Sequence, residues 1–450
     1  MYMLHILIHN LTDTYGPHVK KGIQGREATI IYRLVNRSVH LGLTGDIVVV
    51  SPQIPSDFID YIQKVTGQLL VLVTADFPSE SGPITTKQLL DPLRKLHGQN
   101  FLLDPYVQSA TIAQFSEEVN IPLAYTSAEH LKNGLTLRAN DKAHFREVAP
   151  KLRIPTVEDQ TTISITDTKN LEVIMHKLLD KYGGTFIQAN LSAGGDGNID
   201  IHKRDDKTYH SKLGTDLTDI TEKLFAWAKL MKEEGCDKVI LAPYLTLFET
   251  YTVSGFIPKE GEPYIFGIFK QLVNESGDYR GFTFPARGKY VGECDKPMRA
   301  SAKNWLDSLQ KEGYVGPSNL DFIIGHNKRL GKVLAASESN TRWDGFRFAL
   351  QHGARIAGWD LRTLSGISGS QIAIKAVDYV PTSFATTTEL VQRLQEKQIP
   401  LLGYTDQKQG VVIMLPPEQT EKSYKTALAV IGQNSEVVEK LFDAAQESIQ

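Results

Sequence analysis

The chain of 450 residues has few cysteines, no long apolar run and almost no excess of charge. It contains two cysteines, Cys236 and Cys294, which is typical of a reducing compartment, although one disulfide between them is conceivable. No stretch of about 18 apolar residues occurs, so no membrane span is expected. The apolar start, MYMLHILIHNL, lacks a basic segment, which predicts a first β-strand rather than a signal peptide. We therefore expect a cytoplasmic protein.

The charge balance limits the possible partners. The chain carries 49 basic and 52 acidic residues, a formal net charge of −3, and its Lys and Arg residues are scattered, with no run of five or more. A protein that binds nucleic acid without sequence preference needs a basic surplus to displace counterions. We therefore expect neither nucleic acid nor a membrane as a partner.

The first 110 residues alternate strand-like runs with helix-like ones. The apolar runs HILIHNL, GDIVVVSP and GQLLVLVTAD are rich in Ile, Val and Leu and are bounded by turn residues, as in a parallel sheet covered by helices. A crossover helix is expected over residues 29–41. The turn after the first strand reads NLTDTYG rather than GxGxxG. The sequence therefore predicts a Rossmann-like open α/β domain that does not bind a dinucleotide.

The rest of the chain is expected to be α+β. FETYTVSGFI and EGEPYIFGIFKQLV alternate as antiparallel strands, and NLDFII and GKVLAAS flank the turn GHNKRLG as a hairpin. The last 70 residues predict a small α+β cap. The expected domains are 1–125 (the Rossmann-like domain), 126–355 (with a small subdomain at 150–245 and a larger one at 246–355) and 356–450 (the cap).

Polar residues gather around the predicted hairpin. Glu338 and Asn340 are two residues apart, so they share one face of a strand. Asp321 lies on the partner strand. Because directly opposed residues share a face, Asp321 shares the face of Glu338 and Asn340 if each opposed pair in the hairpin has residue numbers that add to an odd total. Two carboxylates and an amide oxygen suit Mg²⁺, which takes one or two protein carboxylates and fills its other positions with water and phosphate oxygens. The alternative is a solvated hairpin end with incidental acids.

Two further motifs have the chemistry to bind phosphate. The loop SAGGDGN, residues 192–198, follows a strand, and its glycines leave backbone N–H groups open to an anion, although the same residues suit an ordinary hairpin turn. Lys142 opens a helix that is expected to end near Ala149, before Pro150. Its ammonium could reach phosphate, or it could be a solvated first-turn lysine with Asn140 as the helix cap.

Taken in order, these motifs resemble the ATP-grasp superfamily of carboxylate–amine and carboxylate–thiol ligases. The resemblance covers roughly residues 140–345: NDK, a strand with a glycine loop, a strand with a later glutamate, an aspartate, and then Glu-x-Asn-x-Arg. The domain in front resembles the pre-ATP-grasp domain. The tail GVVIMLPPEQTEKSYKTALAVIGQNSEVVEKL is similar to the extra C-terminal domain of the pheganomycin-type peptide ligases.

The resemblance implies a role for each matching residue. ATP phosphates would be bound by Lys142, by Gln188 on the strand before the glycine loop, and by the loop residues Gly194, Gly195 and Gly197. The adenine would pack against the hinge residues Ala242, Tyr244 and Leu245, and Glu249 would bind the ribose. Mg²⁺ would be bound by Asp321, Glu338 and Asn340. Arg342 would lie near the reacting carboxylate, and Lys270 is the candidate replacement for a missing cation.

That cation is missing because Gln188 stands where the family usually has a second phosphate lysine. Ala242 replaces a common acid, and Asn319 replaces a common arginine. The resemblance implies an ATP-dependent and Mg²⁺-dependent amide or peptide ligase that acts on small acids and amines, such as amino acids or peptides. It also makes a homodimer a possible assembly. The alternatives are a nucleotide-binding protein without ligase activity and an ATP-grasp kinase or carboxylase with another acceptor.

Overall fold

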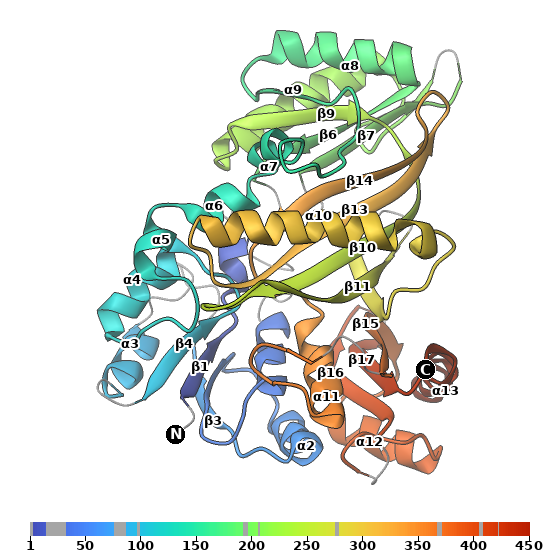
Figure 1. The fold of residues 1–450 in the computed structure, drawn as a ribbon. Helices are drawn as coiled ribbons and strands as arrows, with labels where there is room; N and C mark the ends of the chain where they lie inside the picture. Colours follow the sequence, from blue (N-terminus) through green and yellow to red (C-terminus); the bar gives the residue numbers. More distant parts are fainter. Residues whose placement is uncertain are drawn as a thin grey trace.

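The computed structural model describes residues 3–14, 33–75, 87–96, 100–191, 197–205, 208–274, 279–366, 371–404, 408–421 and 423–450. Within this part of the chain the strands form three sheets of four, eight and five strands. Figure 1 shows the five-stranded sheet at the top, above the end of the eight-stranded sheet that residues 316–340 form, with the four-stranded sheet and the C-terminal segment side by side below.

The N-terminal domain is the expected parallel sheet. Its strands lie in the order β3-β2-β1-β4, and every pairing between them is parallel. Its elements are β1 (Leu4–Ile8), η1 (Leu11–Thr14), η3 (Asn36–His40), β2 (Ile47–Val50), α2 (Ser56–Thr66), β3 (Val71–Thr74), α3 (Lys87–Arg94), β4 (Phe101–Pro105) and α4 (Ala110–Val119). The helix expected over residues 29–41 is confirmed only in its described part, where η3 follows a short helical turn.

Three short helices, α5 (Ala128–Lys132), α6 (Leu135–Asn140) and α7 (Lys142–Val148), lead into the five-stranded sheet. As predicted, α7 ends just before Pro150. The sheet has the order β5-β9-β6-β7-β8, and α8 and α9 cover its outer face (Figure 1). Its elements are β5 (Thr161–Ser164), α8 (Thr168–Tyr182), β6 (Gly184–Ala189), β7 (Asn198–Lys203), β8 (Tyr209–His210), α9 (Leu217–Glu233) and β9 (Lys238–Pro243).

The eight-stranded sheet is antiparallel and has the order β14-β13-β10-β11-β12-β15-β17-β16. The predicted hairpins are present as β10–β11 and β13–β14. Its first half contains β10 (Thr246–Ile257), β11 (Tyr264–Val273), β12 (Tyr279–Phe284), α10 (Val291–Lys311), β13 (Gly316–Asn327) and β14 (Gly331–Asn340). The remaining elements are α11 (Arg347–Ala357), β15 (Ala373–Thr382), α12 (Thr387–Glu396), β16 (Gly410–Gln419), β17 (Tyr424–Gly432) and α13 (Ser435–Ile449).

The C-terminal segment has the expected α+β elements, and its strands continue the central sheet because β12 pairs with β15. One hydrophobic core joins this segment to the N-terminal domain, and the Ile413 amide donates to the Tyr61 hydroxyl at 2.8 Å. The two cysteines are free and buried in different cores, so no disulfide joins them. No described helix is long and apolar enough to span a bilayer.

Candidate functional site

A β-bulge determines the geometry of the β13–β14 hairpin. From the turn up to Phe322, which is opposite Ala336, the residue numbers of opposed pairs add to an even total. Continued unchanged, this register would place Asp321 opposite Ser337 and turn Glu338 to the other face. The bulge leaves Ser337 unpaired in the ladder, and its hydroxyl donates to the Asp321 carbonyl at 3.1 Å. Asp321 is therefore directly opposite Glu338.

The next pair, two residues along each strand, is Asn319 opposite Asn340, so both asparagines share the face of the two carboxylates. The Asn340 amide nitrogen donates to Asp321 Oδ2 at 3.1 Å and to Asn319 Oδ1 at 3.2 Å. Asp321 Oδ1 also accepts from Thr252 Oγ1 at 2.5 Å and from Gln271 Nε2 at 3.1 Å. The three residues predicted as metal ligands are therefore brought together.

The two carboxylates destabilise each other's charged form. Burial and the neighbouring Glu338 raise the pKa of Asp321 to about 7. Burial also acts on Glu338, but Lys142 and Arg342 outweigh it and hold the pKa of Glu338 below its usual range. A pair of this kind, with one carboxylate repelled and one stabilised, favours a cation between them.

Lys142 reaches this pair from the first turn of α7. Its Nζ lies 3.3 Å from Glu338 Oε2, although the side chain is only 6 % exposed, and its backbone N–H donates to the Asn190 carbonyl at 3.1 Å, just beyond β6. The preceding residue, Asn140, accepts from the Thr341 amide at 2.7 Å and so fixes α6 against the end of β14. Asp141, rather than Asn140, caps α7, because its carboxylate accepts from two backbone amides of the first turn.

Two further residues belong to the cluster and were not predicted. Arg146 lies one helical turn after Lys142, donates to the Ala336 carbonyl at 2.7 Å and interacts electrostatically with Glu338. The spacing of four residues could have revealed it, since positions i and i+4 share a helix face. Asp344 accepts from the Ser254 hydroxyl, and burial raises its pKa to about 6. No sequence pattern marked Asp344.

The five-stranded sheet presents the predicted hinge to this cluster. Ile187, Val239 and Leu241 pack under α8 and α9, so the alternating residues of β6 and β9 face the central sheet. Gln188 is among them and is 5 % exposed; its Nε2 donates to Asn198 at 3.1 Å, and its Oε1 has no hydrogen-bond partner among the described residues. Gln188 therefore offers a buried acceptor atom toward the space between the sheets.

The hinge residues lie at the same interface. Ala242 and Leu245 pack with Ala335 of β14 in one small core. The Tyr244 ring stacks on His202, with centroids 4.3 Å apart and planes 19° apart. This aromatic pair is a flat surface of the kind against which a base can stack. His202 was not predicted, and strand alternation alone could not have marked it.

The predicted glycine loop is described only in part. Gly194 and Gly195 lie outside the described residues. The Gly197 carbonyl accepts from the Ala189 amide at 2.9 Å, where β6 and β7 form the predicted hairpin.

Glu249 and Lys270 form an ion pair that does not face Asp321. The two side chains are 2.9 Å apart. Glu249 lies three residues before Thr252, which is opposite Asp321, and the ladder is regular between them, so Glu249 faces the other side of the sheet. Lys270 is opposite Tyr251 and shares that other side.

On that side the Glu249 carboxylate also accepts from Tyr251, at 2.5 Å, and from the backbone amides of Lys289 and Tyr290, just before α10. A Cβ atom at Gly288 would lie 2.5 Å from the carboxylate, so glycine is required there. The structure therefore does not bring Glu249 and Lys270 into the cluster of Asp321.

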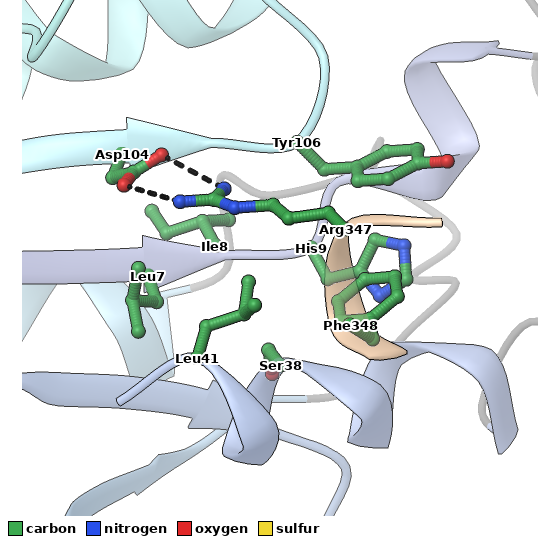
Figure 2. A pocket seen from close by; sticks show the side chains of 9 residues that line it. All are labelled: Leu7, Ile8, His9, Ser38, Leu41, Asp104, Tyr106, Arg347 and Phe348. Carbon is green, nitrogen blue, oxygen red and sulfur yellow. Dashed lines mark hydrogen bonds and ion pairs between the residues drawn. The ribbon is translucent and has the colours of Figure 1, made fainter. Parts of the chain in front are cut away.

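The segment after β14 contacts the N-terminal domain. Arg342 donates to the Asn340 amide oxygen, and its backbone forms an isolated antiparallel bridge with Val107. Figure 2 shows Arg347 reaching Asp104 at the end of β4 with both terminal nitrogens, at 3.0 and 3.3 Å, beside a small cavity at the end of β1. This ion pair is buried, since the two side chains are 3 % and 0 % exposed. The segment that begins at the carboxylate cluster is thus anchored on the N-terminal sheet.

Searches against family models and against curated protein sequences found no match. Solved structures, in contrast, match over the whole chain. A biotin carboxylase from Campylobacter jejuni in complex with β-γ-ATP superposes with a TM-score of 0.62 at 14 % identity, over 100 % of this chain and 92 % of that one. The fold is that of the ATP-grasp enzymes.

Two other structures support the ATP-grasp fold. N5-carboxyaminoimidazole synthetase from Staphylococcus aureus, complexed with ADP, has a TM-score of 0.53 at 11 % identity over 98 % of this chain and 96 % of that one. The biotin carboxylase domain of the Hydrogenobacter thermophilus 2-oxoglutarate carboxylase, with MgADP and bicarbonate, has a TM-score of 0.58 at 13 % identity over 100 % of this chain and 90 % of that one. At such low sequence identity, the structural similarity shows the fold of the chain and not its substrates.

Within this ATP-grasp fold, the donor set at Asp321, Glu338 and Asn340 fits a magnesium ion. No group of three His, Cys, Asp or Glu residues among the described residues could hold a metal. Mg²⁺ does not need such a group, because one or two carboxylates suffice when water and phosphate fill the other positions. The mutual repulsion that raises the pKa of Asp321 would be relieved by a divalent cation there.

Proposed function

We propose that this protein is an ATP-dependent and Mg²⁺-dependent ligase that joins a carboxylate to an amine through an acyl phosphate and releases ADP and phosphate. The observation that carries the proposal is the contact between Lys142 and Glu338. This contact supports the proposal because it brings the lysine that opens α7 to 3.3 Å from a carboxylate on the central sheet. In this proposal the triphosphate of ATP lies between the sheets, and amino acids or peptides are the substrates.

Each residue of the cluster has a role that its contacts support. Lys142 is 6 % exposed and fixed through its own backbone, so it would bind phosphate oxygens without a large loss of side-chain entropy. Asp321, Glu338 and Asn340 would hold Mg²⁺, which would supply charge neutralisation at the β- and γ-phosphates. Gln188 would orient an adjacent phosphate or water by hydrogen bonding.

Phosphoryl transfer requires alignment and charge neutralisation more than covalent help from the protein. Arg342 lies beside Asn340 and has a planar guanidinium that can bind a carboxylate with two hydrogen bonds. It would position the substrate carboxylate for attack on the γ-phosphate. Glu249 and Lys270 are left out of this proposed set because they occupy the other face of the central sheet.

The test is a screen of the proteinogenic amino acids, singly and in pairs, for ADP and phosphate release with Mg-ATP, with amide products detected by mass spectrometry. The Glu338→Gln variant is expected to abolish turnover and keep the fold. Glu260→Gln, at an exposed position, is the matched control and should remain active. Release of AMP and pyrophosphate instead of ADP, or normal turnover in Glu338→Gln, would refute the proposal.

A second candidate function is carboxylation with bicarbonate as the acid. It is favoured by the full-length similarity to a carboxyaminoimidazole synthetase and to two biotin carboxylases. Radioactive bicarbonate added to the same screen distinguishes the two, since only a carboxylase would transfer the label to an organic product, which is measured at alkaline pH because N-carboxylated products lose CO2 in acid. Tight binding of ATP without ADP release under any of these conditions would instead identify a nucleotide-binding protein without catalysis.

A further inference from the structure

The crevice at the carboxyl ends of β1 and β4 is a small cavity whose lining includes Ile8, His9, Asp104 and Tyr106. The chain runs from β1 to β2 and β3 on one side and returns to β4 on the other, so the strand order reverses between β1 and β4. In open α/β sheets this reversal point is where ligands bind, outside the carboxyl ends of the strands. The residues at this place are those that follow β1 and β4, and the proposed function assigns none of them.

Asn10 connects the two strand ends. Its amide nitrogen donates to the Val107 carbonyl at 2.7 Å and to Asp13 Oδ2 at 2.9 Å, and its amide oxygen accepts from the Val107 amide at 2.9 Å. Asn10 is fully buried, so these bonds fix the geometry. The Asp13 carboxylate and the Val107 carbonyl oxygen are consequently within about 6 Å of each other.

Asp13 is a carboxylate with no cationic partner among the described residues. It accepts from the Asn10 amide and from the Ser109 hydroxyl, and none of its described interactions is with a lysine or arginine. Burial raises the pKa of Asp13 to about 6, against the effect of these two hydrogen bonds. A half-buried carboxylate of this kind is stabilised by a cation from outside the protein, because charges that are removed from water need a partner.

The same strand ends hold a second polar atom without a partner. His9 precedes Asn10 and is 4 % exposed, and its Nδ1 has no hydrogen-bond partner among the described residues. Figure 2 shows its ring beside the small cavity, between Tyr106 and Phe348. Burial, together with the charge of Arg37, lowers the pKa of His9 to about 3, so the ring is neutral. These strand ends therefore hold one carboxylate without a cationic partner and one neutral polar atom without a hydrogen-bond partner among the described residues.

This crevice adjoins the proposed catalytic cluster. The Val107 backbone, which Asn10 holds, forms a bridge with Arg342, and the Trp343 amide donates to the Tyr106 carbonyl at 3.2 Å. Bridged residues have Cα atoms about 5 Å apart. Asp13 is thus linked through Asn10 and Val107 to the segment that would bind the reacting carboxylate.

We propose that Asp13 binds the ammonium group of the acceptor substrate, a primary amine, at the carboxyl ends of β1 and β4 and accepts its proton. This inference rests on the proposed ligase function. In the step, an ammonium N–H bond breaks and its proton passes to the Asp13 carboxylate. The amine nitrogen forms a bond to the acyl carbon, and the C–O bond to phosphate breaks with its electron pair leaving on inorganic phosphate. The nitrogen loses its second proton to the departing phosphate, which leaves the neutral amide. Asn10 and Ser109 are positioning residues for the carboxylate.

The experiment measures two products with full-length protein, Mg-ATP and the proteinogenic amino acids as acids. Hydroxylamine, which is uncharged at neutral pH, traps the acyl phosphate as a hydroxamate, and the same amino acids serve as charged amines for amide formation. For Asp13→Asn we expect hydroxamate formation within twofold of the wild type and a fall in amide formation of about 100-fold. Asp13→Glu, which keeps the charge, should recover part of the loss.

The outcomes separate the two proposals. Absence of hydroxamate in the wild type would refute the ligase proposal and this inference with it. Equal amide formation by Asp13→Asn and the wild type, or an equal loss of both products, would overturn only the role of Asp13. Asp60→Asn, an exposed carboxylate of α2 in the same domain, is the matched control and should change neither product. A cooperative thermal transition for Asp13→Asn, with a midpoint at or above that of the wild type, is the expected sign that it folds, because burial raises the pKa of Asp13.

Discussion

Asp321→Asn is expected to make the metal-free protein more stable while it abolishes turnover. In the absence of a cation, the Asp321 carboxylate is buried opposite the Glu338 carboxylate, and both effects raise its pKa to about 7 from 3.8. Asparagine has nearly the same shape and no charge. The substitution therefore removes a repulsion that the folded state experiences and the unfolded state does not.

The magnitude follows from this shift in pKa. One unit corresponds to about 1.4 kcal/mol, so a shift of about three units destabilises the ionised folded state by about 4 kcal/mol. Asn340 donates to Asp321, and in the variant this bond is retained only if the new amide presents its oxygen. A mismatch there costs about 1 kcal/mol. The expected net gain is about 3 kcal/mol.

The free energy of unfolding of the metal-free wild type should depend on pH. Because the folded state binds the proton more tightly than the unfolded state, wild-type stability falls as the pH rises from about 4 to about 7 and is then level. The Asp321→Asn variant lacks this fall, so its advantage should be absent near pH 4 and complete above pH 7. Urea denaturation in EDTA at pH 4.5, 6 and 8 measures it, with Asp180→Asn, whose side chain is 81 % exposed, as the control.

Magnesium should make the wild type more stable than the Asp321→Asn variant. Added Mg²⁺ is expected to stabilise the wild type and to have little effect on Asp321→Asn, because binding to the folded state raises stability only when the site is intact. A variant that is less stable than the wild type at pH 8 in EDTA, or an advantage that does not vary with pH, would refute the reasoning.

Three further predictions concern contacts around the site. Lys142→Met should weaken binding of a non-hydrolysable ATP analogue with Mg²⁺ by about 10- to 100-fold in isothermal titration, and an unchanged affinity would remove Lys142 from the phosphate site. Arg347→Met leaves Asp104 buried with His5 but without its arginine and should cost about 3–5 kcal/mol in urea denaturation, whereas combining it with Asp104→Asn should recover part of that cost; no recovery would contradict the ion-pair explanation. His40 and His352 are hydrogen-bonded at 2.8 Å, and burial lowers both pKa values. The free energy of unfolding should therefore be constant above pH 6.5 and fall below it by about 1.4 kcal/mol per pH unit for each histidine. In urea denaturation, His352→Gln should remove one histidine's share of that slope.

Local sequence signals predicted much of the fold. Alternating apolar residues and turn signals gave the β10–β11 and β13–β14 hairpins, and Pro150 gave the end of α7. The parallel N-terminal sheet followed from continuous apolar runs. The sequence could not show that β15 pairs with β12 and extends the central sheet, because strand pairing over long separations leaves no local pattern.

The candidate site shows the same division. The sequence by itself determined the types of donor at Asp321, Glu338 and Asn340, and therefore the class of cation that could bind. Only the tertiary structure decided that they meet, since the bulge at Ser337 shifts the register that the turn would otherwise impose. A one-residue shift moves a side chain to the other face of a strand, and a bulge is not encoded in residue type.

Tertiary structure also determines where Lys142 and Lys270 point. Lys142 reaches Glu338 because Asn140 is hydrogen-bonded to Thr341, a contact between residues 201 positions apart. Lys270 has the same charge and points away, because its strand position is opposite Tyr251. Sequence thus determined which groups were available for chemistry. Packing between distant segments decided which of them share one face, because alternation fixes faces within a strand and only register relates one strand to the next.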